Sequence, residues 1–128
     1  MNNINSIMIV GNLVRDPVKK DFTNSKVVEF TIASNDYITG KDGVPKKETC
    51  FVSVKCWGFL ADRTMTLVKG NRVLVDGRLK LESWKSKDGT EASKIVIIAS
   101  QVEKIGIDKN AMEVQTQMNQ SDDNDLPF

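Results

Sequence analysis

The stretch CFVSVKCW, residues 50–57, has the alternation of a β-strand and divides its side chains between two faces. Successive side chains of a strand point to opposite sides. The thiol and aliphatic side chains share one face: Cys50, Val52, Val54 and Cys56. The aromatic and polar side chains share the other face: Phe51, Ser53, Lys55 and Trp57. The stretch therefore predicts a strand with one face in a hydrophobic core and with aromatic rings and a positive charge on the opposite face.

The two cysteines are predicted to be small buried hydrophobic residues of this core. At roughly 3.3 Å per residue, Cys50 and Cys56 lie about 20 Å apart along one strand, whereas a disulfide requires Cα atoms within about 7 Å. The chain has no histidine, which excludes triads and general-base schemes that depend on histidine. Two thiols without histidine also make a poor zinc site, so we expect no metal and no cofactor.

Length and composition predict a single globular domain. The 128 residues are enough to bury a core without disulfides or metal, and 40% hydrophobic with 27% charged residues is an ordinary globular balance. No apolar run is long enough to span a bilayer, and the N-terminus MNNINSIMIV lacks the features of an export signal. We therefore expect a cytoplasmic protein without membrane contacts.

Hydrophobic periodicity predicts five strands and one helix. The expected strands span residues 4–14, 26–37, 50–57, 71–84 and 94–105, and the expected helix lies within 58–70, with Lys69-Gly70 as its stop. Three strands, a helix and two strands follow one another in the five-stranded OB barrel, whose exposed sheet face and hairpin loops bind oligonucleotides. We therefore predict an all-β fold: a five-stranded OB-fold barrel with one helix between strands 3 and 4.

Local signals add detail to this barrel. Gly11 suggests a bulge or bend in the first strand. Residues 39–47 contain two glycines, a proline and three lysines and are expected to form a solvated loop, whereas Asp88-Gly89 suggests a hairpin tip. In the fourth strand the phase predicts that Val73, Val75, Leu79 and Leu81 point inward.

The pattern ends after the last strand, and the charge changes with it. Residues 1–106 hold 17 Lys and Arg against 12 Asp and Glu, a net charge of +5, whereas residues 107–128 carry a net charge of −4. We expect residues 1–106 to be the OB-fold domain, 107–120 a flexible polar linker and 121–128 an acidic tip, the last two forming a disordered tail. A basic body with an acidic tail suggests two classes of partner.

Aromatic and cationic side chains lie in the same phase on three strands. The rings belong to Tyr37, Phe51, Trp57 and Trp84, and the cations to Lys55, Arg78 and Lys80. Single-stranded nucleic acid requires this combination, because bases stack on rings and cations follow the phosphates. The alternative is that the rings cover a second sheet or another subunit. We interpret the seven residues as a binding face for single-stranded nucleic acid.

The first strand and the chain end suggest protein contacts. Residues 7–10 and 95–98 are apolar on both faces, which indicates a subunit interface or, alternatively, a well-covered central strand. The chain ends in SDDNDLPF, residues 121–128. Solubilisation explains its acids but not a terminal Pro-Phe, which suits capture by an apolar pocket with a basic rim. The predicted partner-binding residues are Asp122, Asp123, Asp125, Leu126, Pro127 and Phe128.

Four segments resemble bacterial single-stranded DNA-binding proteins, whether encoded by chromosomes, phages or plasmids. They are NSIMIVGNLVRDP (5–17), VKCWGFLAD (54–62), LVKGNRVLVDGRL (67–79) and SDDNDLPF (121–128). The base-stacking aromatics of that family fall on Tyr37, Phe51, Trp57 and Trp84. Tyr37 and Phe51 replace tryptophans that are usual in some members, and Glu82 stands where a basic residue is common.

The resemblance implies a homotetramer of OB domains without cofactor or catalysis. Such a protein coats single-stranded DNA during replication, recombination and repair in the nucleoid, and its tail recruits enzymes of those processes. One alternative is an OB-fold adaptor of replication restart, against which the four aromatics and the terminal Pro-Phe argue. Another is a metal-dependent nuclease, but the acidic residues Asp16, Asp36, Asp62 and Asp76 share no strand face that would gather a two-metal site.

Overall fold

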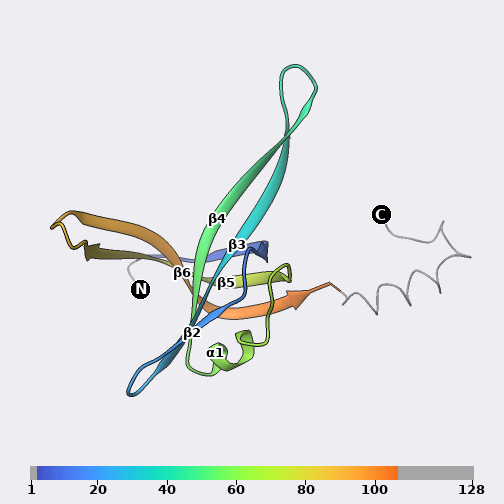
Figure 1. Cartoon of the computed structure of the whole chain (residues 1–128). Helices are drawn as coiled ribbons and strands as arrows, with labels where there is room; N and C mark the ends of the chain where they lie inside the picture. The colour runs from blue at the N-terminus through green and yellow to red at the C-terminus, as the bar shows by residue number, and fades with distance from the viewer. Residues whose placement is uncertain (1–2, 107–128) are drawn as a thin grey trace, which may run out of the picture.

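Five strands close into a barrel in the computed structural model, which describes residues 3–106 (Figure 1). The elements are β1 (Ile7–Leu13), β2 (Val18–Asp21), β3 (Lys26–Thr39), β4 (Pro45–Trp57), α1 (Phe59–Thr64), β5 (Arg72–Lys85) and β6 (Glu91–Ile105). The strand order is β1-β5-β6-β4-β3-β2, and an additional pairing of β1 with β3 closes the barrel. The short strand β2 pairs with β3 outside the closed set. The predicted five-stranded barrel with a helix between its third and fourth strands is confirmed.

The helix is shorter than expected and ends at Thr64 instead of near Gly70. The hydroxyl of Thr64 donates to the carbonyls of Leu60 and Ala61, and such bonds compete with helical ones. Beyond the helix, the backbone N–H of Lys69 donates to a carboxylate oxygen of Asp16. The backbone of this segment therefore finds partners outside a helix, and α1 does not extend.

Of the bulge or bend predicted at Gly11, the bulge is wrong, because the register of β1 against β5 runs without a shift from Ile7 to Asn12. At Gly11 the backbone of β3 approaches closely, and a Cβ there would lie 2.8 Å from the carbonyl oxygen of Ala33. The register shift of the sheet lies instead between β5 and β6, beside Gly77.

Alternation accounts for the barrel interior. The core contains the side chains that the strand phases turned inward, including Val28, Phe30, Ile32, Val54, Cys56, Val73 and Val75. Burial raises the pKa of the Cys56 thiol to about 11. The thiol is therefore protonated at neutral pH and acts as a small hydrophobic residue.

Two hairpins extend beyond the barrel as arms, β3–β4 and β5–β6 (Figure 1). The loop predicted for residues 39–47 is shorter, because Thr39 already pairs with Pro45. Three predictions of burial are wrong on these arms: Cys50 is exposed, and Leu79 and Leu81 are 39% and 62% exposed. The three side chains have the same strand phase as the core residues. The arms extend beyond the barrel, however, and no opposing strand of the described chain covers these side chains.

No helix among the described residues is long and apolar enough to cross a membrane. The predicted linker (107–120) and acidic tip (121–128) lie outside the described residues, as do the six residues of the tip assigned to partner binding.

Candidate nucleic-acid interface

The outer face of the barrel runs continuously across four strands. Direct register neighbours join Glu29 on β3 to Lys55 on β4, Lys55 to Ile98 on β6, and Ile98 to Arg78 on β5. The next row leads in the same way from Ser53 through Val96 to Lys80. Side chains two residues apart along a strand share its face. Segments far apart in the sequence thus contribute to one surface.

All four predicted aromatic residues lie exposed. Their exposed fractions are 74% for Tyr37, 66% for Phe51, 42% for Trp57 and 47% for Trp84. Phe51 and Tyr37 lie on one face of the β3–β4 arm, opposite Ala33 and Lys47, and Trp84 lies on the β5–β6 arm opposite Ala92. No second sheet of the described chain covers these rings, so the proposed alternative of an intramolecular cover does not hold within residues 3–106.

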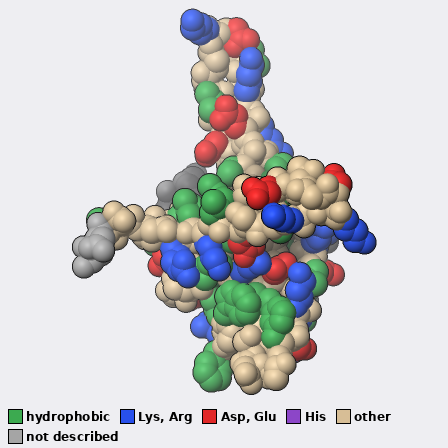
Figure 2. All heavy atoms as spheres, turned by 90° about the vertical axis from the view of Figure 1, so that its left-hand side faces the viewer, with side chains coloured by type: hydrophobic (Ala, Val, Ile, Leu, Met, Phe, Trp, Pro, Cys, Tyr) green, Lys and Arg blue, Asp and Glu red, His purple; other side chains and the backbone are tan. Residues whose placement is uncertain are grey.

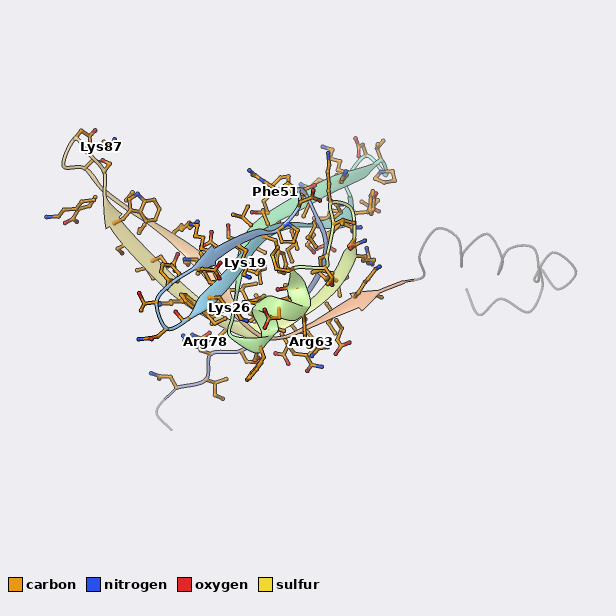
Figure 3. All side chains as sticks on the ribbon, turned by 60° about the horizontal axis from the view of Figure 1, so that its bottom comes forward. Lys19, Lys26, Phe51, Arg63, Arg78 and Lys87 are labelled. Carbon is orange, nitrogen blue, oxygen red and sulfur yellow. The ribbon has the colours of Figure 1, made fainter. Side chains whose placement is uncertain are left out.

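Cations lie between and beside the rings. On the face seen in Figure 2, a band of Lys and Arg side chains crosses the barrel, with hydrophobic side chains above and below it. Arg78 and Lys80 are exposed, and neither takes part in an ion pair within the described residues. Figure 3 shows the two arms diverging from the barrel, with Phe51 on one and Lys87 at the tip of the other.

Lys55 differs from the other predicted cations, because two carboxylates already hold it. Its Nζ lies 2.7 Å from Oε2 of Glu82 and 3.2 Å from Oε1 of Glu29, and only 17% of its side chain is exposed. Glu82 thus neutralises Lys55 and ties β5 to β4. The geometry does not favour Lys55 as a phosphate contact, in contrast to our expectation. The phase of one strand shows which face a side chain lies on, but it does not show which side chains of other strands contact it.

The electrostatics of this cluster favour its charged forms. Burial opposes the ammonium of Lys55, but the hydrogen bonds and charges of Glu82 and Glu29 outweigh it and raise the pKa of Lys55. Burial likewise opposes ionisation of Glu29, yet the bond and charge of Lys55, with a smaller contribution from Lys20, lower the pKa of that carboxyl. The three side chains therefore form an ion-paired link between β3, β4 and β5.

Further cations surround a depression of about 430 Å³ beside this link. Arg15, Lys20 and Lys94 line it together with Lys55, against only two carboxylates, Asp16 and Glu29. Arg15, Lys20 and Lys94 were not among the residues predicted from the sequence. Lys94 was detectable, since it precedes Val96 by two residues and shares its face. Arg15 and Lys20 were not, because they belong to a turn and a short strand without clear periodicity.

The described part of the chain contains no cluster of side chains that could bind a metal ion. Within residues 3–106, no three His, Cys, Asp or Glu side chains gather closely enough to hold a metal ion. What the outer face offers is a broad surface of exposed rings and cations, which suits a flexible anionic ligand with stacking groups.

Comparison with known proteins agrees with this surface. A model of the "Single-strand binding protein family" matches residues 4–105. The single-stranded DNA-binding protein of Aquifex aeolicus is 39% identical over 110 residues, which are 84% of this chain and 74% of that protein. Single-stranded DNA-binding protein 2 of Chlorobaculum tepidum is 38% identical over 107 residues, covering 80% of this chain and 72% of the relative.

A third relative and a solved structure are longer than this chain. The single-stranded DNA-binding protein of Helicobacter hepaticus is 35% identical over 101 residues, 77% of this chain but 59% of the relative. The crystal structure of a deletion mutant of the single-stranded DNA-binding protein from Thermus aquaticus superposes with a TM-score of 0.71 at 23% identity. It covers 80% of this chain and 51% of that one, and it supports the fold.

Replacing Lys55 tests the ion-paired link. Lys55→Met leaves Glu29 and Glu82 without their shared cation, and we expect the free energy of unfolding to fall by about 1–3 kcal/mol. Lys80→Met, at an exposed position of the same face, should change it by less than about 0.5 kcal/mol. Urea unfolding at neutral pH measures both. Equal stability of the two variants would contradict the role assigned to Lys55.

The stability difference between the parent protein and Lys55→Met depends on pH, because the pKa values of Glu29 and Lys55 are shifted. Because the pKa of Glu29 is lowered, this group adds to the free energy of unfolding at pH values above its ordinary pKa of 4.5. That stabilisation is lost as the pH falls through the pKa of Glu29 in the folded protein. Because the pKa of Lys55 is raised, this group adds to the free energy of unfolding at pH values below its ordinary pKa of 10.5. That stabilisation is lost as the pH rises through the pKa of Lys55 in the folded protein. The gap between the parent protein and Lys55→Met should therefore be widest between these limits and narrow in acid.

Proposed function

The chain belongs to the single-strand binding protein family, and from this we propose that it binds and coats single-stranded DNA with the outer face of its barrel and arms. The observation that carries the proposal is the exposure of all four in-phase rings, on β3, β4 and β5, together with the exposed cations Arg78 and Lys80 of β5. The relatives named above are single-stranded DNA-binding proteins, and the family match spans nearly all described residues.

Recognition then follows from the two kinds of side chain. Bases stack on Tyr37, Phe51, Trp57 and Trp84, each stacked base contributing about 1–3 kcal/mol. Arg78 and Lys80 contact phosphates, helped by the cations around the depression beside Lys55. Duplex DNA is excluded because its bases are already stacked and hidden. Binding of this kind needs neither catalysis nor a cofactor.

We also propose that the protein assembles as a homotetramer. Leu79, Leu81 and Ile95 form an exposed apolar patch on the inward phase of the β5–β6 arm, since Leu81 pairs with Ile95. Met8 on β1 is a second exposed apolar position. Apolar groups clustered in this way favour burial against another subunit. The subunit interface expected from residues 7–10 and 95–98 thus involves fewer of those residues, because Val96 and Ile97 are already buried.

The C-terminal tip adds a second role to the proposal. The acidic residues Asp122, Asp123 and Asp125 do not favour contact with phosphate. Leu126, Pro127 and Phe128 with its carboxylate suit a pocket on another protein. We assign the tip to recruiting enzymes of replication, recombination and repair to coated DNA in the nucleoid of the cytoplasm.

Tryptophan replacement tests base stacking. Trp57→Ala or Trp84→Ala should weaken binding of oligothymidine by about 1–3 kcal/mol, while Ile105→Ala, at the end of β6, should not. Binding should quench tryptophan fluorescence in the parent protein, and a duplex of equal length should bind far less well. Unchanged affinity in both folded variants, or equal affinity for duplex, would contradict the proposed face.

Charge placed in the apolar patch tests assembly. The parent protein should have the mass of four chains by light scattering, and Leu81→Lys should lower it, because a charge at a buried subunit contact is costly. Val44→Lys, at an exposed apolar position on the tip of the other arm, should leave the mass unchanged. A monomeric parent protein would contradict the tetramer.

Deletion of Phe128 tests recruitment. The shortened protein should lose capture of replication and repair enzymes from a bacterial lysate, since the terminal ring and carboxylate are its proposed ligand. Affinity for single-stranded DNA should stay the same, or rise slightly at low salt if residues 121–128 are removed altogether. Asn124→Ala, which retains the terminal Phe, is the control. Capture that persists without Phe128 argues against this role.

A further inference from the structure

A cluster of three aromatic residues lies where β4 ends, and the strand phases assigned only one of them, Trp57, to DNA. The other two are Phe22, in the β2–β3 turn, and Phe59, at the start of α1. The ring centroids of Phe22 and Trp57 are 6.0 Å apart with planes inclined by 24°, a stacked arrangement. Phe22 is 54% exposed and Phe59 is 90% exposed. These two rings are large apolar surfaces without an assigned role.

Strand register and ring stacking together connect Phe22 to the proposed DNA-binding face. Lys20 on β2 and Trp57 on β4 are both direct neighbours of Val27 on β3, so the three side chains share the outer face. Phe22 lies just beyond β2, in the turn, and its ring joins this face by stacking on Trp57. Val27 points outward and is only 2% exposed, and its register neighbour Trp57 carries the stacked Phe22 ring. The cluster is therefore continuous with the face that carries Trp57.

Backbone hydrogen bonds hold both new rings in place. The N–H of Phe22 donates to the carbonyl of Ser25 at 2.7 Å and closes the β2–β3 turn. The N–H of Gly58 donates to the carbonyl of Lys26 at 3.1 Å, and Gly58 has a φ of 64°, which turns the chain from β4 into α1. Phe59 is thereby presented at the helix start beside the beginning of β3.

A depression of about 400 Å³ lies between the two phenylalanines. Its lining consists of Asp21, Phe22, Asn24, Ser25, Lys26, Gly58 and Phe59. Phe22 lines this depression, and Trp57 is not among its lining residues. The Phe22 ring thus borders the depression and is also stacked on Trp57.

We propose that Phe22 and Phe59 form an additional base-stacking subsite, in which the strand that leaves Trp57 places a further nucleobase between the two rings. The inference rests on the proposed function, because Trp57 must itself lie on the DNA path. Stacking accepts every base, since each has a π-face. Figure 3 shows Lys26 and Arg63 around α1, next to this corner. Arg63 is exposed and takes part in no ion pair within residues 3–106, so it is available to a phosphate.

A single-tryptophan reporter tests the subsite directly. In a Trp57→Phe, Trp84→Phe background, which keeps an aromatic ring at both positions, Phe59→Trp provides the only tryptophan. Addition of long oligothymidine should quench it, because a base stacks on this ring. Ile105→Trp in the same background should stay unquenched. Binding without quenching at position 59, seen by anisotropy of labelled DNA, overturns the subsite but leaves the proposed function intact.

Affinity provides the second readout. Phe22→Leu and Phe59→Leu keep an apolar side chain but remove the ring, and each should weaken binding of long oligothymidine about 5- to 150-fold, the range for one stacked base. Tryptophan quenching by saturating DNA should persist. Unchanged DNA affinity together with a lower oligomer mass would assign the rings to a subunit contact and overturn the subsite. Failure of the parent protein to bind single strands would instead overturn the proposed function.

Discussion

Closure of the barrel depends on one strand, β1, which pairs with two others. It pairs with β5 along most of its length and with β3 at Asn12 and Leu13. This double pairing closes the five long strands into a barrel and creates an enclosed interior for the core. It requires the backbones of β1 and β3 to meet at Gly11, where a Cβ would lie 2.8 Å from the carbonyl oxygen of Ala33. A side chain at this position would force apart the strands whose contact closes the barrel.

Closure uses only part of each long strand, and the remainder forms the two arms (Figure 1). Within the barrel, one face of each strand is buried and the other exposed. On the arms the described chain supplies no opposing wall, so side chains of both phases are exposed, Cys50 as well as Phe51 and Leu81 as well as Trp84. The arms therefore enlarge the surface available to a long flexible ligand, and in the proposed assembly their apolar groups would contact a neighbouring subunit.

Charge has two roles on the outer face. Near the centre, Lys55 is neutralised by Glu29 and Glu82, because an ammonium with little contact with water requires counter-charges. This cluster connects three strands and stabilises the surface on which the rings are mounted. Arg78 and Lys80 lie exposed and remain hydrated until an anion approaches, so their charge is available for attraction. The ion pair with Glu82 thus gives Lys55 a structural role.

The sequence by itself determined the order of the five barrel strands and the helix, the phase of these strands and the outward position of the four aromatic rings, but it did not predict β2. Alternation is a property of the strand backbone, and it needs no knowledge of neighbours. Only the tertiary structure decided where each strand leaves the barrel, which exposes Leu79 and Leu81, and which partners meet across strands. Lys55 contacts two carboxylates far away in the sequence, and Phe22 stacks on Trp57 from a turn without periodicity. Such contacts follow from the lateral register of distant strands, which the period of a single strand does not contain.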